Sequence, residues 1–432
     1  MKNYILLLLS CCSFTLQAQY QINADRLEQS LKKLQQFGNN AAGGNDRIAY
    51  SQHELDARAY LISRMEKIGL QVRVDAAGNI SALRPGTNPK APIIAFGSHI
   101  DAVPNGGHYD GNVGSMGGLE VMETLVEQNI PTEHPFELLF FTNEEGGVFG
   151  SRALAGKIDT SALGVVTSSG YTNREGVLRL GGAPDKIKSI ARSPNQLHAF
   201  VELHIEQGST LYEKNIPIGI VEGIVGLKWW DVTITGFANH AGTTPMNNRQ
   251  DALLAAADFI KMVRRVVRSI PGRQVGTVGR IAAYPGAPNV IPGKVVLSLE
   301  LRDLSSEKIK KLFASIQQEA TKIGEQTNTS FAFAPIDATS DPALMDQRIQ
   351  KIIKEEATTL GYDTLILPSG AGHDAQDMAL ITPTGMIFVP SVDGISHSPK
   401  EYSTPEAIAK GTQVLLNTLL RLDKAKMEKS KL

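Results

Sequence analysis

Acidic and histidine side chains follow the short apolar runs of this 432-residue chain. The run LLFFTN leads into the adjacent carboxylates Glu144 and Glu145, and the run IIAFGS leads into His99 and Asp101. Two carboxylates placed together at the end of a buried strand repel each other unless a positive group lies between them. A divalent cation meets this need, because one glutamate can bind it while its neighbour acts as general base on an activated water.

Three more candidates occupy similar positions. Asp110 lies in the glycine-rich stretch NGGHYDGNVG, His204 ends the run AFVELH, and His397 lies in the loop after the run MIFVP. Ligands of open α/β sheets bind at the carboxyl ends of the strands, so these side chains converge if the runs are neighbouring strands. The pattern predicts a two-metal site in which each ion takes a histidine and the ions share a carboxylate. Asp101 is expected to accept the second imidazole N–H of His99.

The elements that must position these residues follow from hydrophobic patterning. Helices are expected at residues 22–37 and after Ser51, where SQHE has the form of a capping box. Uninterrupted apolar runs of four to eight residues indicate strands that are buried on both faces of a helix-flanked sheet. Such runs occur at residues 92–99, 137–145, 199–204 and 385–390.

Residues 226–337 have the pattern of a second, smaller unit. A long amphipathic helix is expected there, with one apolar face formed by Leu253, Ala256, Ile260, Val263 and Val267. Strict alternation around Arg302 predicts a strand that directs this arginine away from the apolar side. The order β-α-β-β-α-β predicts a small sheet with two helices on one face. The expected fold is therefore α/β, with a mostly parallel, helix-flanked sheet in a catalytic domain (20–225 and 338–432) and an inserted α+β lid domain (226–337).

Composition limits the class of protein and its location. A net charge of −1, with 42% apolar residues, argues against a nucleic-acid binder, which usually carries a basic surplus. Residues 1–19 have the pattern of a secretory signal, too short for a stable transmembrane span, with lipidation at Cys11 as an alternative to cleavage at Ala18 or Gln19. The protein is thus expected to be periplasmic or secreted. Both cysteines lie in this segment, so nitrogen and oxygen atoms must hold any metal.

Eight motifs in order give a more specific indication. They are GSHID with GGHYDG, NEEGG, ELHIEQG, ANHAGTTPM, PNVIPG, LELRD, GAGHDA and ISHSP. Together they resemble the amidase branch of the M20 metallopeptidase clan, which includes allantoate amidohydrolases and N-carbamoyl-L-amino-acid hydrolases. The resemblance covers nearly the whole chain after the signal. It implies Glu144 as catalytic base, one metal on His99, Asp110 and His204, and a second metal on Asp110, Glu145 and His397, with Asp110 bridging.

The same resemblance implies substrate contacts from Gln207, His240, Asn289, Arg302, Gly372 and His373. His240 would also stabilise the oxyanion, in its own subunit or in the partner of a homodimer formed through the inserted domain. The implied reaction is hydrolysis of a ureido or amide C–N bond on a small carboxylic acid, with two divalent ions (Zn, Mn, Co or Ni). Allantoate, an N-carbamoyl-L-amino acid, ureidoglycolate, an N-acyl amino acid or a dipeptide all suit an arginine clamp. A catalytically inactive binding protein on the same fold is the alternative of another class.

Other interpretations of these motifs are weaker. The glycine-rich stretch at 106–118 lacks the Gly-Lys-Ser/Thr ending of a phosphate loop. Ser369, His373 and Asp374 crowd into six residues and do not indicate a catalytic triad. His53, His134 and His198 have no expected role and are predicted to lie on the surface.

Overall fold

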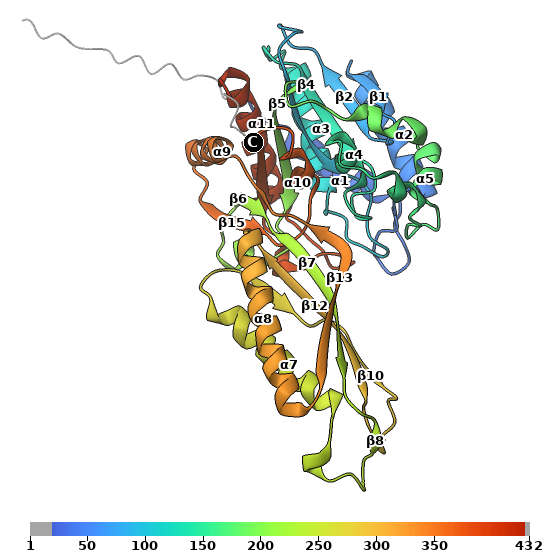
Figure 1. The fold of residues 1–432 in the computed structure, drawn as a ribbon. Helices are drawn as coiled ribbons and strands as arrows, with labels where there is room; N and C mark the ends of the chain where they lie inside the picture. The colour runs from blue at the N-terminus through green and yellow to red at the C-terminus, as the bar shows by residue number, and fades with distance from the viewer. Residues whose placement is uncertain (1–19, 428–432) are drawn as a thin grey trace, which may run out of the picture.

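A computed structural model describes residues 20–427 of the chain (Figure 1). The predicted signal segment, residues 1–19 with Cys11, lies outside the described residues, so export stays a prediction. In the part that is described, no helix combines the length and the apolar character needed to cross a bilayer.

Within residues 20–427 the larger sheet has nine strands in the order β1-β2-β4-β3-β5-β16-β6-β14, with β15 paired to β6. Its centre, β4-β3-β5-β16, is parallel, and antiparallel pairs extend it on both sides. The strands are β1 (Gln71–Val74), β2 (Ile80–Arg84), β3 (Ile93–His99), β4 (Phe136–Phe141), β5 (Leu197–Ile205), β6 (Ile218–Ile224), β14 (Ala343–Leu344), β15 (Thr364–Ser369) and β16 (Thr384–Val389).

Helices cover both faces of this sheet, because its central strands are apolar on both sides. Phe96 and Leu138 pack in one hydrophobic cluster with α1, α2, α3, α9 and α11, whereas Ala95 and Leu139 pack in another with α4, α6 and α10. The helices are α1 (Ala24–Gln35), α2 (Gln52–Lys67), α3 (Asn112–Glu127), α4 (Phe149–Leu154), α5 (Asn173–Arg179), α6 (Thr210–Glu213), α9 (Gln347–Thr359), α10 (Asp374–Met378) and α11 (Pro405–Lys424). Short 3₁₀ turns are η1 (Thr160–Gly164), η2 (Pro184–Ile190) and η4 (Val392–Gly394). The predicted helix-flanked sheet is confirmed.

A smaller antiparallel sheet projects from the larger domain, with two long helices on one face (Figure 1). Its strands are β7 (Gly226–Thr235), β9 (Val275–Thr277), β10 (Ile281–Tyr284), β12 (Lys294–Asp303) and β13 (Ser330–Ser340), and its helices are α7 (Ala252–Ser269) and α8 (Ser306–Thr327). At its outer end lie η3 (Met246–Asn248) and the short pair β8 (Asn239–His240) and β11 (Val290–Ile291). Along β12 burial alternates, and Arg302 lies on the side opposite the buried apolar residues.

The prediction for the apolar face of α7 was partly wrong. Ala256 is fully buried, but Leu253 is 41% exposed and Ile260 is 38% exposed. Phe259 is fully buried instead and packs against the rings of β13, at 5.6 Å from Phe331. Apolar residues cover more than one side of this helix, so the pattern does not decide which side faces the sheet. The helix is rotated to bury its aromatic ring, which leaves an apolar strip exposed.

One of the histidines predicted to be on the surface is buried. His53 is exposed, but His134 is buried, and its ring lies 4.2 Å from that of half-buried His198. The cause is the end of α11, where Asp423 accepts the backbone N–H of Glu133 and of His134 at 3.0 and 2.8 Å. This carboxylate draws the loop before β4 against the helix and covers the ring.

Candidate active site

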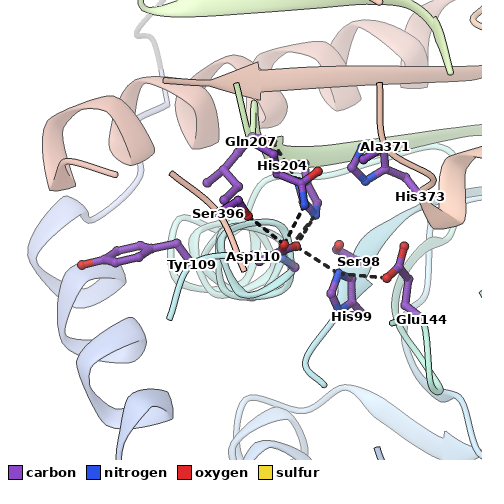
Figure 2. A network of polar contacts seen from close by, with 12 residues as sticks. Ser98, His99, Tyr109, Asp110, Glu144, His204, Gln207, Ala371, His373 and Ser396 are labelled. Atoms are coloured by element: carbon purple, nitrogen blue, oxygen red, sulfur yellow. Dashed lines mark hydrogen bonds and ion pairs between the residues drawn. The ribbon is translucent and has the colours of Figure 1, made fainter. Parts of the chain in front are cut away.

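The predicted site residues of the larger domain gather at the carboxyl ends of its central parallel strands (Figure 2). His99 is the last residue of β3, and His204 lies one residue before the end of β5. Asp110 precedes α3, and Glu144 follows β4. These strands are neighbours in the sheet, so their ends share one edge and bring the side chains together.

Asp110 lies at the centre of the group and directs one carboxylate oxygen to each side. Its Oδ1 is 3.1 Å from Nε2 of His204 and 3.5 Å from Nε2 of His99. Its Oδ2 is 3.1 Å from Nε2 of His397, whose ring nitrogen is also 3.6 Å from Oε2 of Glu145. The sequence-predicted ligands therefore form two sets of three that share Asp110.

Backbone carbonyl groups orient the two buried imidazoles. The Nδ1 atom of His204 lies 2.9 Å from the carbonyl oxygen of Ile205, and that of His99 lies 3.1 Å from the carbonyl oxygen of Asp101. With an N–H at Nδ1, the other nitrogen, Nε2, lies on the side of Asp110 and can bind a metal ion once it has lost its own proton, which is the tautomer a metal ligand needs.

The carboxylate of Asp101 has a different part from the predicted one. It lies 3.6 Å from Nδ1 of His99 and instead accepts the backbone N–H of Glu144 and of Glu145 at 3.3 and 3.2 Å. The turn after β4 brings these amides to the end of β3, where they compete with the imidazole. Asp101 thus ties the adjacent glutamates to the strand that carries His99.

Burial and crowding shift the titration of the site. Burial raises the pKa of Glu144 well above its ordinary value, although the charge of His99 opposes the shift. Burial and the charge of Asp110 raise the pKa of Glu145 to about 7. Burial also tends to raise the pKa of Asp110, but hydrogen bonds from the surrounding imidazoles hold this pKa well below the usual range. The hydrogen bond to Asp110 raises the pKa of His397 to about 9.

The donor set fits divalent cations. In each set of three, one ligand atom per residue lies within 4.8 Å of the others, and the atoms are imidazole nitrogens and carboxylate oxygens. Such mixed ligation suits transition metals such as zinc, manganese, cobalt or nickel. Positive charge between the carboxylates would relieve their repulsion. Glu202, also close to His204, is committed elsewhere, because its oxygens accept from Ser98 Oγ at 2.8 Å and Ala375 N at 2.9 Å.

A cavity of about 660 Å³ opens over this group and extends toward the smaller sheet. Gln207, Gly372 and His373 line it on the side of the larger domain, and Arg302 reaches it from β12. Gln207 donates to Asp110 Oδ2 at 2.7 Å. His373 is buried beside His204, with ring centres 4.4 Å apart, and burial holds its pKa well below the usual range.

The guanidinium of Arg302 is held at the wall of the cavity. Its Nε is 2.8 Å and one terminal nitrogen is 3.2 Å from the Glu300 carboxylate, while the other terminal nitrogen donates to the carbonyl of Gly370 at 2.6 Å. Three of the five N–H groups of the arginine are engaged, which leaves two for a ligand. Glu300 also accepts from the indole of Trp229, another residue of the cavity wall.

Two predicted substrate contacts are far from this cavity. His240 is exposed on β8, and Asn289 is exposed directly before β11, at the outer end of the smaller sheet (Figure 1). Neither lines the cavity. Within one chain, in this conformation, the structure does not bring them to the rim.

Sequence reasoning missed several residues of the site. Glu401, Ser396 and Trp229 contact or border the predicted ligands, yet none was singled out. A carboxylate four residues after His397 was the available signal for Glu401, but a charge in a polar loop is usually solvated.

A parallel α/β sheet with histidines and carboxylates on its rim, a buried glutamate beside them and an arginine in the cavity defines a metal-dependent hydrolase. The comparisons narrow this class. The profile of peptidase family M20/M25/M40 matches residues 95–421, and the chain belongs to this family.

Relatives and solved structures agree with this assignment over nearly the full length. An N-carbamoyl-L-amino acid amidohydrolase from Geobacillus stearothermophilus is 41% identical over 406 residues, covering 93% of this chain and 99% of the relative. A ureidoglycolate hydrolase from Arabidopsis thaliana is 35% identical, covering 95% of this chain and 89% of the relative. The crystal structure of an amidase of the hydantoinase/carbamoylase family from Burkholderia multivorans has a TM-score of 0.88 at 34% identity, covering 94% of this chain and 100% of that one.

Proposed function

We propose that the protein is an amidohydrolase that cleaves the ureido C–N bond of an N-carbamoyl-L-amino acid or a similar small ureido acid. The observation that carries this proposal is the placement of Asp110 between two sets of ligands, with the buried Glu144 beside them. The similarity to an N-carbamoyl-L-amino acid amidohydrolase and a ureidoglycolate hydrolase supports the ureido class.

Two cations fit the residues of the rim. His99, Asp110 and His204 would hold one, and Asp110, Glu145 and His397 the other. Divalent ions at these positions would polarise the substrate carbonyl and lower the pKa of water and of Glu144. The role of the protein is to orient the ligands before the substrate binds. The contacts of the two buried imidazoles with backbone carbonyl groups do this.

Glu144 is the proposed general base. Its carboxylate lies 3.6 Å from His99 Nε2 and faces the cavity, and its backbone is tied to Asp101. It would take a proton from the attacking water and deliver it to the leaving nitrogen. Glu145 is proposed as a ligand and not as the base, because its carboxylate lies beside His397 and Asp110. Adjacent glutamates thus divide the roles of base and ligand.

Arg302 is the proposed clamp for the substrate carboxylate. Its two remaining N–H groups suit bidentate recognition, and Glu300 holds the planar group so that little side-chain entropy is lost on binding. Gln207, Gly372 and His373 border the same space and would contact the ureido group. The distance between the guanidinium of Arg302 and the ligands at the rim would then set the length of substrate that fits, from its carboxylate to its reacting carbon.

His240 is proposed to act in a homodimer, in which the smaller domain of one subunit reaches the cavity of the other. Its Nδ1 accepts the N–H of Gly242 at 3.0 Å and of Thr243 at 3.2 Å, so Nε2 carries the proton and can donate to an oxyanion. The exposed apolar strip of α7, formed by Leu253, Leu254 and Ile260, supports an interface on this domain.

The test is release of ammonia by metal-loaded protein. N-carbamoyl-L-amino acids, allantoate and ureidoglycolate would be compared, with a dipeptide and an N-acetyl amino acid assayed by free amine. Hydrolysis of an N-carbamoyl-L-amino acid should yield the amino acid, carbon dioxide and ammonia in equal amounts. Amine release from the dipeptide or N-acetyl compound alone would contradict the ureido proposal, and no turnover with two bound ions would favour a binding protein.

A further inference from the structure

We propose that Glu401 is a positioning residue that couples the two loops carrying Asp110 and His397, and so sets the affinity of the cation site that these ligands form with Glu145. This inference rests on the metal-binding role proposed above. Glu401 is not among the residues that line the cavity, so its action is through the ligands.

The contacts of Glu401 join the loops by one side chain. Its Oε1 accepts the backbone N–H of Tyr109 at 2.8 Å and of Asp110 at 3.0 Å. Its Oε2 accepts the hydroxyl of Ser396 at 2.8 Å and the backbone N–H of His397 at 3.2 Å. One carboxylate therefore takes four hydrogen bonds, two from each loop, and only 3% of the residue is exposed.

Ser396 extends the connection to the shared ligand itself. Its hydroxyl lies 3.2 Å from Asp110 Oδ2, the oxygen that faces His397 (Figure 2), and 2.8 Å from Glu401, so its single proton can be donated to either carboxylate. The carboxylate oxygen that would meet the cation is thus located by the same group that locates His397. A shift of Glu401 would move both ligands of that set.

The backbone of each loop is built around this carboxylate. His397 has a φ of +53°, a conformation that is unfavourable for a residue other than glycine, and its N–H is held by Glu401. On the other loop, a Cβ at Gly107 would lie 2.0 Å from Oε1 of Glu401 and 2.6 Å from its Cβ. Only glycine leaves room there, because the stem of Glu401 as well as its end is in the way.

Two substitutions disturb this contact in independent ways. Glu401→Gln keeps the size of the side chain but offers one oxygen, so one pair of N–H or O–H donors then faces an NH₂ group. Gly107→Ala leaves Glu401 in the chain and displaces it sterically. Both are expected to weaken the cation site of Asp110, Glu145 and His397 by about 10–100-fold, the usual effect of losing a group that orients a ligand.

A matched control is Asp423→Asn. Asp423 is also a buried carboxylate that accepts two backbone N–H groups, but it ties α11 to the loop before β4, away from the rim. If Glu401 served stability alone, its variants would resemble this control, with a lower melting temperature of the metal-free protein and unchanged cation affinity.

The experiment titrates Zn²⁺ and Mn²⁺ into the metal-free full chain against a competing chelator, with thermal unfolding of each metal-free variant. We expect two ions per wild-type chain, one of them bound at least about 10-fold more weakly in Glu401→Gln and Gly107→Ala, and unchanged affinities in Asp423→Asn. Excess metal should restore kcat with KM unchanged. Wild-type affinities in both variants would overturn the inference alone, whereas a wild type that binds no cation would overturn the proposed metal role as well.

Discussion

The rim of the larger sheet and the outer end of the smaller one both carry residues assigned to the reaction, but they are built differently. At the rim, His99 and His204 are almost fully buried, and each has its second ring nitrogen held by a carbonyl group. At the outer end, His240 is exposed and is held only by its own turn. The proposed cation ligands come together within one chain, whereas the proposed role of His240 would need movement of the smaller domain or a second chain.

The largest expected effect concerns the rim. Glu144→Gln should lower kcat on the order of 10³-fold, because it removes the proton acceptor while leaving a side chain of the same shape. Cation content should be unchanged, since Glu144 is not among the five residues of the two sets. Activity would be followed by ammonia release and cation content by elemental analysis. Activity near that of the wild type would remove Glu144 from its proposed role.

The next largest effect concerns His240 at the outer end of the smaller sheet. It tests whether this histidine serves the site of its own chain or that of a partner subunit. His240→Ala should lower kcat on the order of 10²-fold, as expected for one lost oxyanion donor. Mixing it with Glu144→Gln, under conditions that allow subunits to exchange, should restore about a quarter of wild-type activity, because half of the dimers then carry one intact site. No recovery on mixing would mean that His240 serves its own chain or no site at all.

A smaller effect is expected where the two regions meet. Arg302→Lys should reduce kcat/KM by about 10–100-fold, mainly through KM, because an ammonium cannot form the bidentate contact. Arg280→Lys is the control, since this arginine of the smaller domain pairs with Asp231 and lies outside the cavity. Equal effects of the two substitutions would contradict the carboxylate clamp.

The smallest effect on the stability of the folded chain is expected from substitutions on α7. Replacing Leu253 and Leu254 together by serine should change the free energy of unfolding of the monomer by less than about 1 kcal/mol, because both side chains are exposed. The proposed dimer, measured by sedimentation, should nevertheless dissociate. Leu178→Ser, at an exposed site on the larger domain, should leave it intact. A double variant that sediments like the wild type would place the interface elsewhere.

Much of the site was predictable because strand ends in a parallel sheet are visible as local patterns. Apolar runs predicted β3, β4, β5 and β16 to within a few residues, and each strand ends in or is followed by chemistry-bearing side chains. The rotation of α7 was not predictable, because apolar residues extend around more than one side and the fit of Phe259 against β13 chose between them. The exposure of Leu253 follows from that packing and from no feature of the helix itself.

By itself the sequence determined the class of fold and the identity of the candidate ligands. Only the tertiary structure decided that Asp101 holds the amides of the two adjacent glutamates, that His240 lies away from the rim, and that Glu401 joins the two ligand loops. The physical reason is distance along the chain. Glu401 and Tyr109 are 292 residues apart, and a hydrogen bond between them leaves no periodicity or local motif that neighbouring residues could reveal.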